Sequence, residues 1–282
     1  MASPLARLRR SITGSGPPVV PAVRLQGTIA AGAGIGRQLN LAALEGTLSK
    51  AFKLKRVPFV ALLINSPGGS AAQSHLIFRR IRELAERHDK KVVAFCEDVA
   101  ASGGYMLACA ADEIVADPSS IVGSIGVISK SFGFQDAIAR RGVERRVYSA
   151  GGSKDFLDPF RPEREEERDH IKRLQSEVHR HFIDLVKERR GAKLSDEEPL
   201  FEGLFWSGAT AQRLGLVDAL GDVHAVVRDR CGEEASVKVL SPARKPIWRR
   251  LGGDAAGGVA EDAVAGLAAA VEERALWARY GL

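Results

Sequence analysis

The stretch FVALLINSPGGS, residues 59–70, decides the fold of this chain. Its first six residues are apolar, which is typical of a strand buried on both faces of a sheet. Gly68 and Gly69 then form a turn, and apolar residues recur at helical spacing over residues 70–87. Glycine suits such a turn because a side chain would restrict the backbone and keep a ligand away from its N–H groups. The stretch predicts a buried strand, a glycine turn and an amphipathic helix.

The same order recurs along the chain. A second apolar run, residues 92–96, is followed by Ala100-Ala101-Ser102-Gly103-Gly104-Tyr105 and a helical pattern over residues 102–111. Strands are also predicted over residues 23–29, 113–116 and 144–148, and residues 123–128 are expected to form a turn leading into a further strand. Helices are predicted over residues 40–52, 134–141, 163–189, 222–230 and within 205–220. The side chains expected to face inward include Leu76, Ile77, Ile81 and Leu84 on one helix, and Ile171, Leu174, Val178, Phe182 and Leu185 on another. This alternation predicts βαβ units and a parallel sheet, an α/β fold.

Composition limits the choice of function. The chain has 282 residues, 45% of them hydrophobic, enough for one large domain with a real core. We expect an N-terminal arm over residues 1–20, a main domain over 21–240 and an extension over 241–282 with an amphipathic helix. The net charge of +6 gathers near the two ends of the chain, which is typical of solvated tails. Contact of the terminal helix with a membrane or another subunit stays open. No nucleic-acid partner is expected, because aromatic residues do not interleave with the basic ones.

Cysteine and histidine patterns indicate neither a metal site nor a cofactor. Cys96 and Cys109 lie in apolar runs and are expected to be buried thiols. The histidines lie in polar helical stretches, without the spacing of a metal site. No apolar run is long enough for a transmembrane helix, and the first residues lack the apolar segment of a signal peptide. We therefore expect a cytoplasmic or membrane-peripheral protein.

Three features together suggest nucleophilic chemistry. Ser102 is a lone hydroxyl before a helix, Lys154 lies in the small-residue loop Ser149-Ala150-Gly151-Gly152-Ser153-Lys154, and Gly69 ends the first glycine turn. Separately, each has an ordinary explanation: a helix N-cap, a surface lysine and a plain turn. Ser66 and Ser70 are expected to be turn and cap residues. The ends of parallel strands are where open α/β sheets place their sites, so the conjunction favours a serine nucleophile, a lysine base and backbone oxyanion donors.

Residues 64–127 resemble the signal peptide peptidase SppA family, serine peptidases of the ClpP/crotonase superfamily. The matching motifs are Asn65-Ser66-Pro67-Gly68-Gly69, Ala100-Ala101-Ser102-Gly103-Gly104-Tyr105, Ala111-Asp112, Gly123-Ser124-Ile125-Gly126-Val127, Gly151-Gly152-Ser153-Lys154-Asp155, and Ser207-Gly208 to Gly215-Leu216-Val217-Asp218. The resemblance covers roughly residues 22–225. It implies a ClpP/crotonase-like spiral of ββα and βαβ units with a parallel sheet and C-terminal helices.

The resemblance also implies roles for individual residues. Ser102 would attack the peptide carbonyl, Lys154 would take its proton, and Ser124 would orient the lysine. The backbone N–H groups of Gly69 and Gly103 would bind the oxyanion. A lysine accepts a proton only when neutral, which a desolvated site favours. Lys154 lies 52 positions after Ser102, so the fold or a neighbouring subunit must bring the two together.

The family implies the partners as well. Its short single-domain forms assemble as rings or domes in which the serine and the lysine come from different subunits. This chain has one copy of the motifs, so a homo-oligomer is expected. Its substrates would be peptides, unfolded proteins or membrane-derived segments. Many members carry an N-terminal membrane anchor that this sequence does not show, so signal-peptide remnants are not a necessary substrate.

Two other functions remain open at this stage. A crotonase-type acyl-CoA hydratase or isomerase would share the architecture and hold a thioester oxyanion with the same glycine turns. Such enzymes use acidic residues and lack the Ser102–Lys154 pair. A scaffold that kept only the fold would not need Ser102, Ser124 and Lys154 together.

Overall fold

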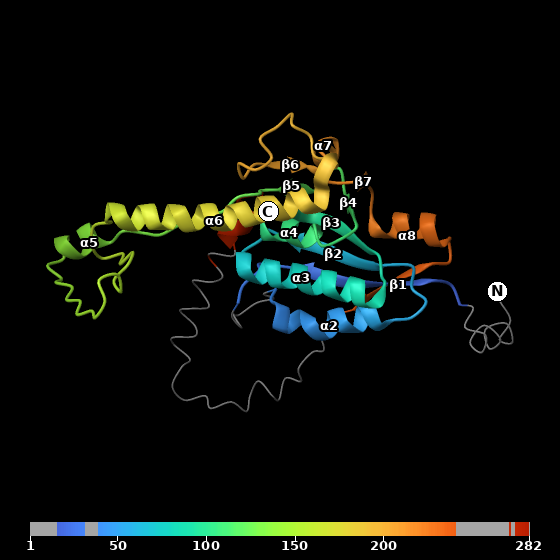
Figure 1. The fold of residues 1–282 in the computed structure, drawn as a ribbon, viewed down its shortest axis with the longest axis horizontal. Coiled ribbons are helices and arrows are strands. Elements are labelled where there is room, and N and C mark those ends of the chain that lie inside the picture. The colour runs from blue at the N-terminus through green and yellow to red at the C-terminus, as the bar shows by residue number, and fades with distance from the viewer. Residues whose placement is uncertain (1–15, 32–38, 241–270, 272–273, 282) are drawn as a thin grey trace, which may run out of the picture.

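An eight-stranded sheet forms the centre of the computed structural model, which describes residues 16–31, 39–240, 271 and 274–281 (Figure 1). The strands are β1 (Val19–Gln26), β2 (Val60–Ser66), β3 (Val92–Ala101), β4 (Glu113–Ala116), β5 (Ile121–Gly123), β6 (Phe205–Ser207), β7 (Ala219–Leu220) and β8 (Ser236–Leu240). Their order is β6-β5-β3-β2-β1-β8, with β4 between β3 and β7. All pairs are parallel except β5 with β6. The predicted parallel α/β sheet is confirmed.

Helices cover both faces of this sheet (Figure 1). The helices of the described residues are α2 (Leu41–Lys53), α3 (Ala71–His88), α4 (Gly103–Ala108), α5 (Gln135–Arg140), α6 (Glu165–Arg190), α7 (Gly208–Arg213) and α8 (Val223–Cys231), with a short 3₁₀ turn at Gly191–Lys193. Of these, α5 lies away from the sheet. Strand β2 shows how the layers form. Leu62 and Ile64 belong to the main core with α2, α3 and α4, whereas Leu63 packs with α8. Successive side chains of a strand point to opposite faces, so an unbroken apolar run serves two cores.

Several local predictions are confirmed. Asn40 caps α2, since its Oδ1 accepts a hydrogen bond from the N–H of Ala43 at 2.9 Å. Ser70 caps α3 through the N–H of Gln73 at 3.3 Å. Cys96 and Cys109 are buried, and burial raises the pKa of both thiols to about 12. They pack as small apolar side chains in the core.

Other local predictions are wrong, two of them because a predicted strand has no partner strand. The predicted strand over 144–148 is an exposed loop that pairs with none of the described strands, and a strand needs a partner for its backbone groups. Pairing ends at Gly123, so β5 precedes the turn expected over residues 123–128, and the chain leaves the sheet there instead of entering a further strand. Leu76 is 45% exposed on the flank of α3 beside buried Ile77. Strand β1 begins at Val19, within the range expected to be an arm.

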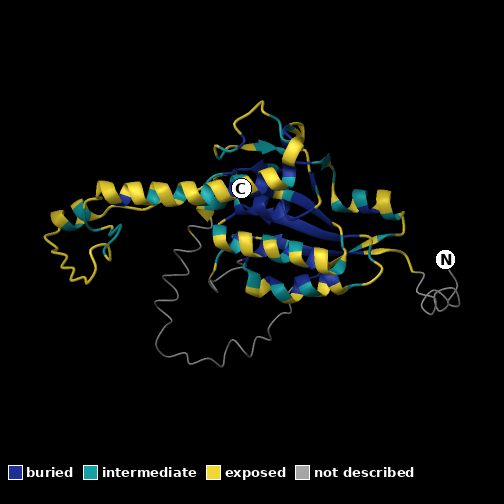
Figure 2. Cartoon of the chain, viewed as in Figure 1, coloured by how far each residue is buried: buried dark blue, intermediate teal, exposed yellow. Residues whose placement is uncertain are grey.

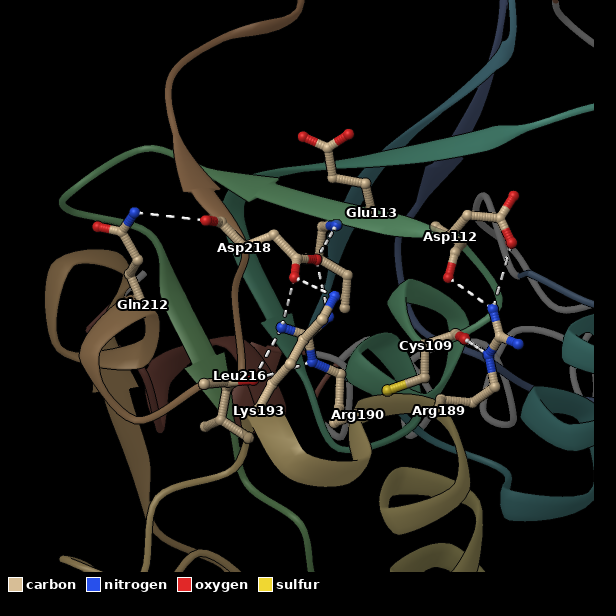
Figure 3. A network of polar contacts seen from close by, with 12 residues as sticks. Cys109, Asp112, Glu113, Arg189, Arg190, Lys193, Gln212, Leu216 and Asp218 are labelled. Atoms are coloured by element: carbon tan, nitrogen blue, oxygen red, sulfur yellow. Dashed lines mark hydrogen bonds and ion pairs between the residues drawn. The ribbon is translucent and has the colours of Figure 1, made fainter.

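Helix α6 extends beyond the rest of the fold. Its C-terminal end is tied down by Arg190, whose guanidinium donates to the carbonyl oxygen of Gly215 (2.8 and 2.9 Å) and to Asp218 (2.7 and 3.1 Å) (Figure 3). Its N-terminal half projects away from the sheet together with α5 and the loops beside it (Figures 1 and 2). We call residues 127–174 the arm. No core lies there to cover Leu174, which is 48% exposed instead of facing inward.

Some expectations concern residues outside the described ranges. They include residues 1–15 of the expected N-terminal arm, the basic residues near both ends, and most of the amphipathic helix expected within residues 241–282. Of that last region, residues 274–278 are described and are helical. Among the helices that the structure describes, none combines the length and apolar character needed to cross a bilayer.

Candidate active site

Ser102 and Ser124 leave the sheet side by side. Ala101 at the end of β3 is the register partner of Gly123 at the end of β5. The N–H of Ser102 donates to the carbonyl oxygen of Gly123 at 2.8 Å, which holds the end of β3 beside the end of β5. The N–H of Ser124 donates to Leu204 O at 2.6 Å. Parallel pairing of β3 and β5 therefore brings together two serines that lie 22 positions apart in the sequence.

Both serines have unusual backbones. Ser102 has φ 52° and ψ −122°, and Ser124 has φ 52°. Non-glycine residues rarely adopt positive φ, and strain of this kind gathers at functional sites. Ser102 stands at the N-cap position of α4, yet its side chain makes no capping hydrogen bond. Ser102 is therefore not a side-chain cap of α4, because its hydroxyl makes no hydrogen bond to the helix.

Two glycine turns surround Ser102. Ile29 pairs with the first turn, donating to Gly68 O at 2.8 Å and accepting from the N–H of Ser70 at 2.7 Å. One of these hydrogen bonds ends at Gly68 and the other begins at Ser70, so neither involves the N–H of Gly69. A Cβ on Gly69 would lie 2.1 Å from Ile29 O, so only glycine fits. Gly103 is the first residue of α4, where a backbone N–H has no partner within the helix.

A cavity of about 420 Å³ joins these groups. It is lined by Pro67, Gly69, Ala71, Ser102, Gly103, Met106, Ser124, Gly126, Val127, Ile128, Val178, Phe182, Glu202, Gly203, Leu276, Arg279 and Tyr280. Four of the five predicted site residues are among them. The lining also includes two apolar side chains of α6, Val178 and Phe182, so the part of α6 that follows the arm borders the site.

The C-terminal segment also lines this cavity. Leu276, Arg279 and Tyr280 contribute to the wall, and the Tyr280 ring meets Phe205 edge to face with centroids 5.1 Å apart. Phe205 is the register partner of Gly123, the residue before Ser124. This end of the predicted terminal helix therefore packs on its own chain, over the candidate site.

Lys154, the fifth predicted site residue, lies elsewhere. It sits in the exposed loop between α5 and α6, close to the first turn of α6. Val178, which borders the cavity, follows Glu165 by 13 residues, and a helix rises about 1.5 Å per residue, so the two ends of this stretch lie about 20 Å apart. The segment between α5 and α6, which carries Lys154, projects away from the sheet at whose strand ends Ser102 lies (Figure 1).

Sequence patterns did not predict that some residues would line the cavity. Val178 and Phe182 were expected only as a core-facing stripe, and nothing about the Glu202-Gly203 turn marks it as part of a site. Of the histidines, His179 comes near, with its Nε2 3.2 Å from the carbonyl oxygen of Ile125. Within the described ranges, no group of three His, Cys, Asp or Glu side chains is arranged to hold a metal ion.

Comparison with known proteins identifies the family. The model of peptidase family S49 matches residues 85–238. The chain is 31% identical over 238 residues to a putative protease of Synechocystis, covering 82% of each chain. It is 53% identical over 271 residues to a protein of Brucella abortus named Na(+)/H(+) antiporter NhaA. That match covers 93% of this chain but only 37% of the longer relative.

A solved structure supports the fold. A membrane-bound stomatin-specific protease in complex with a substrate peptide superposes with a TM-score of 0.51 at 14% identity, over 83% of this chain and 97% of that one. The ClpP-like α/β architecture predicted from the motifs is thereby confirmed. The family model spans more than half of the chain, including both serines and Lys154, and the chain therefore belongs to peptidase family S49 as an SppA-like member.

Proposed function

We propose that this chain is a serine endopeptidase in which Ser102 is the nucleophile and Lys154, from another copy of the chain, is the general base. The observation that carries the proposal is the cavity in which Ser102, Ser124, Gly69 and Gly103 meet. It brings together a nucleophile, a second hydroxyl and two backbone donors, and in this proposal a second copy supplies the base.

The backbone supports acyl chemistry at Ser102. A tetrahedral intermediate on Ser102 would place its oxyanion near the N–H groups of Gly69 and Gly103. Donors of this kind are worth about 3 kcal/mol each in other enzymes, because they are aligned before charge develops. Gly123, the residue before Ser124, pairs with Ala101, the residue before Ser102. Ser124 therefore lies beside Ser102, where its hydroxyl is available to hold an incoming lysine. Among the described contacts, neither serine hydroxyl is committed to another group.

The arm supports a contribution from a second copy. Lys154 is exposed in the single chain, where nothing removes water from its ammonium group. The arm also carries eight of the fifteen exposed large hydrophobic side chains of the described residues: Val127, Ile128, Phe132, Phe134, Val143, Val147, Tyr148 and Leu174. Exposed apolar surface of this density marks an interaction site. Docking against a neighbouring copy would cover these side chains and desolvate Lys154.

The cavity supports a peptide substrate with apolar side chains. Met106 and Phe182 provide apolar surface beside Ser102, and the cavity is of the size that a few side chains would fill. We propose that peptides and unfolded segments are hydrolysed.

The test is hydrolysis of an unfolded protein by the wild type, Ser102→Ala and Lys154→Ala. Each substitution should lower kcat more than about 10³-fold, because residues that act as one catalytic unit fail together. The matched control is Lys130→Ala, an exposed lysine elsewhere on the arm, which should retain activity. Circular dichroism should show the same fold in all four proteins.

Other results would point to the other functions. Peptide hydrolysis that survives Ser102→Ala would contradict the proposed nucleophile. Turnover of acyl-CoA by wild type and Ser102→Ala alike would favour a crotonase-type enzyme. A wild type without activity on either substrate class would favour a scaffold.

A further inference from the structure

Two arginines and two carboxylates form a closed cluster at the tip of the arm. Arg161 contacts Asp155 through Nε at 3.1 Å and also pairs with Glu167. Arg164 lies 2.8 Å from Oδ1 of Asp155 and 2.9 Å from Oε1 of Glu167. Each arginine therefore touches both carboxylates. We call these four residues the arm cluster.

Glu167 is the buried centre of the arm cluster. Its side chain is 5% exposed, whereas that of Glu165 on the same helical turn is 79% exposed. The hydrogen bond from Arg161 outweighs the effect of burial and, with Arg164, lowers the pKa of Glu167 to about 2. Removing a carboxylate from water is unfavourable unless it is paired, and buried ion networks can fix geometry more than they stabilise a fold. A buried charge on a projecting arm, far from the main core, calls for a geometric role.

The cluster holds the backbone next to Lys154. Besides pairing with the Asp155 carboxylate, Arg161 donates from Nη2 to the Asp155 carbonyl oxygen at 2.7 Å. The next residue, Phe156, packs its ring edge against His170 on α6, with centroids 5.4 Å apart. The backbone of Asp155 is thereby tied to Arg161 in the loop before α6, and its carboxylate is tied to Arg161 and to Arg164, the N-cap of α6. The Lys154 side chain itself makes no polar contact within the described residues, so it is free to point outward.

We propose that Asp155, Arg161, Arg164 and Glu167 are positioning residues that fix Lys154 at the tip of the arm so that it can serve as the base at Ser102. This inference rests on the proposed function. A base on a loose loop would sample many positions, and a displacement of about 1 Å can cost on the order of 100-fold in rate. The cluster converts a glycine-rich loop into a fixed extension of α6.

The test compares two carboxylates on one helical turn. Glu167→Gln keeps the size of the side chain and removes its charge, whereas Glu165→Gln alters a carboxylate whose partner is exposed Arg168. In the full chain, Glu167→Gln should lower kcat about 10- to 100-fold with KM changed less than about twofold, since substrate binding is untouched. Glu165→Gln should match the wild type. Asp155→Asn, at the outer side of the cluster, should repeat the effect if Glu167→Gln fails to fold.

A second readout does not depend on activity. A nitroxide on Lys154→Cys, in a chain with Cys231→Ser, reports the motion of the loop, since Cys96 and Cys109 are buried. Glu167→Gln should increase the mobility of the label and Glu165→Gln should not. Wild-type kcat with an unchanged spectrum in both Glu167→Gln and Asp155→Asn would overturn the inference.

Lys154→Ala separates the two hypotheses. If Lys154→Ala is inactive while Glu167→Gln and Asp155→Asn keep wild-type kcat, only the positioning role is wrong. If Lys154→Ala is fully active, the proposed base is wrong and the positioning role falls with it.

Discussion

Ser102 holds strain that a change to glycine should release. Its φ of 52° and ψ of −122° suit glycine better than any side chain. Strain of this type costs about 1–3 kcal/mol, and glycine loses about 0.4–1 kcal/mol through the entropy of the unfolded chain. We therefore expect Ser102→Gly to be inactive yet more stable than the wild type by about 1 kcal/mol, as measured by urea unfolding.

Ser102→Ala is the control for that prediction. It loses the hydroxyl but keeps a Cβ, so it retains the strain and should gain no such stability. Equal stability of the glycine and alanine variants would mean that the backbone at Ser102 is relaxed, and the argument from strain would fail.

Ser124 should affect the rate more than the fold. Its side chain lies in the cavity next to Ser102, and we propose that it holds the incoming lysine. Ser124→Ala should lower kcat about 10- to 100-fold, because the base would lose a partner that fixes its direction. The free energy of unfolding should change little. A variant with wild-type kcat on a peptide substrate would remove Ser124 from the mechanism.

For single residues, the sequence predicted the location of those candidate site residues that follow the ends of strands. Ser102, Ser124, Gly69 and Gly103 follow buried strands or the turns beside them, and parallel pairing brings such residues to one edge of the sheet. Lys154 follows no strand. Its place depends on the direction of α6, which tertiary contacts at the far end of that helix determine, and no local pattern encodes them.

The anchor of α6 makes a prediction about pH. Asp218 is paired with Arg190, whose side chain is 3% exposed (Figure 3). Burial opposes ionisation of Asp218, but the hydrogen bonds from Arg190 and Lys193 outweigh it and lower its pKa from 3.8 to about 2. A lowered folded-state pKa adds stability above the ordinary value, and that stability is lost as pH falls from about 4 towards 2.

Asp218→Asn tests this linkage. The variant should be less stable than the wild type by about 1–2 kcal/mol near neutral pH, a figure reduced for the partial exposure of the carboxylate. The difference should shrink in urea unfolding curves measured as pH falls from about 4 towards 2. Asp229→Asn, which changes an exposed aspartate on α8, is the control. A difference that stays constant with pH would contradict the assigned pairing.

Element prediction succeeded where pattern and burial agree. The apolar run of β2 and the Asn40 and Ser70 caps are local signals, and the structure uses them directly. Residues 144–148 have strand-like composition but no neighbouring strand, and Leu174 has the right spacing on α6 but no core beneath it. Both errors lie in the arm, where local patterns imply a surface that a single chain does not supply.

In the whole molecule, the C-terminal segment narrows the candidate site. Leu276 and Tyr280 line the cavity, and Tyr280 packs on Phe205. A long peptide must share this space, so the Leu276→Ala/Tyr280→Ala double variant should lower KM for a long unfolded substrate several-fold. The kcat for a short ester should not change. Arg274→Ala, an exposed change outside the cavity wall, is the control. A raised KM would mean that these side chains bind substrate instead of competing with it.

The arm makes the final prediction, because the proposed function takes Ser102 and Lys154 of one site from two copies of the chain. Ser102→Ala and Lys154→Ala should each be inactive alone. In a mixed oligomer, the intact serine of a Lys154→Ala copy can meet the intact lysine of a Ser102→Ala copy. With equal and random mixing in a head-to-tail ring, about a quarter of the sites regain both groups. Co-expression with two affinity tags, followed by purification of the mixed species, should therefore recover about a quarter of wild-type hydrolysis. A site built within one chain would recover none, since every chain in the mixture lacks one of the two residues.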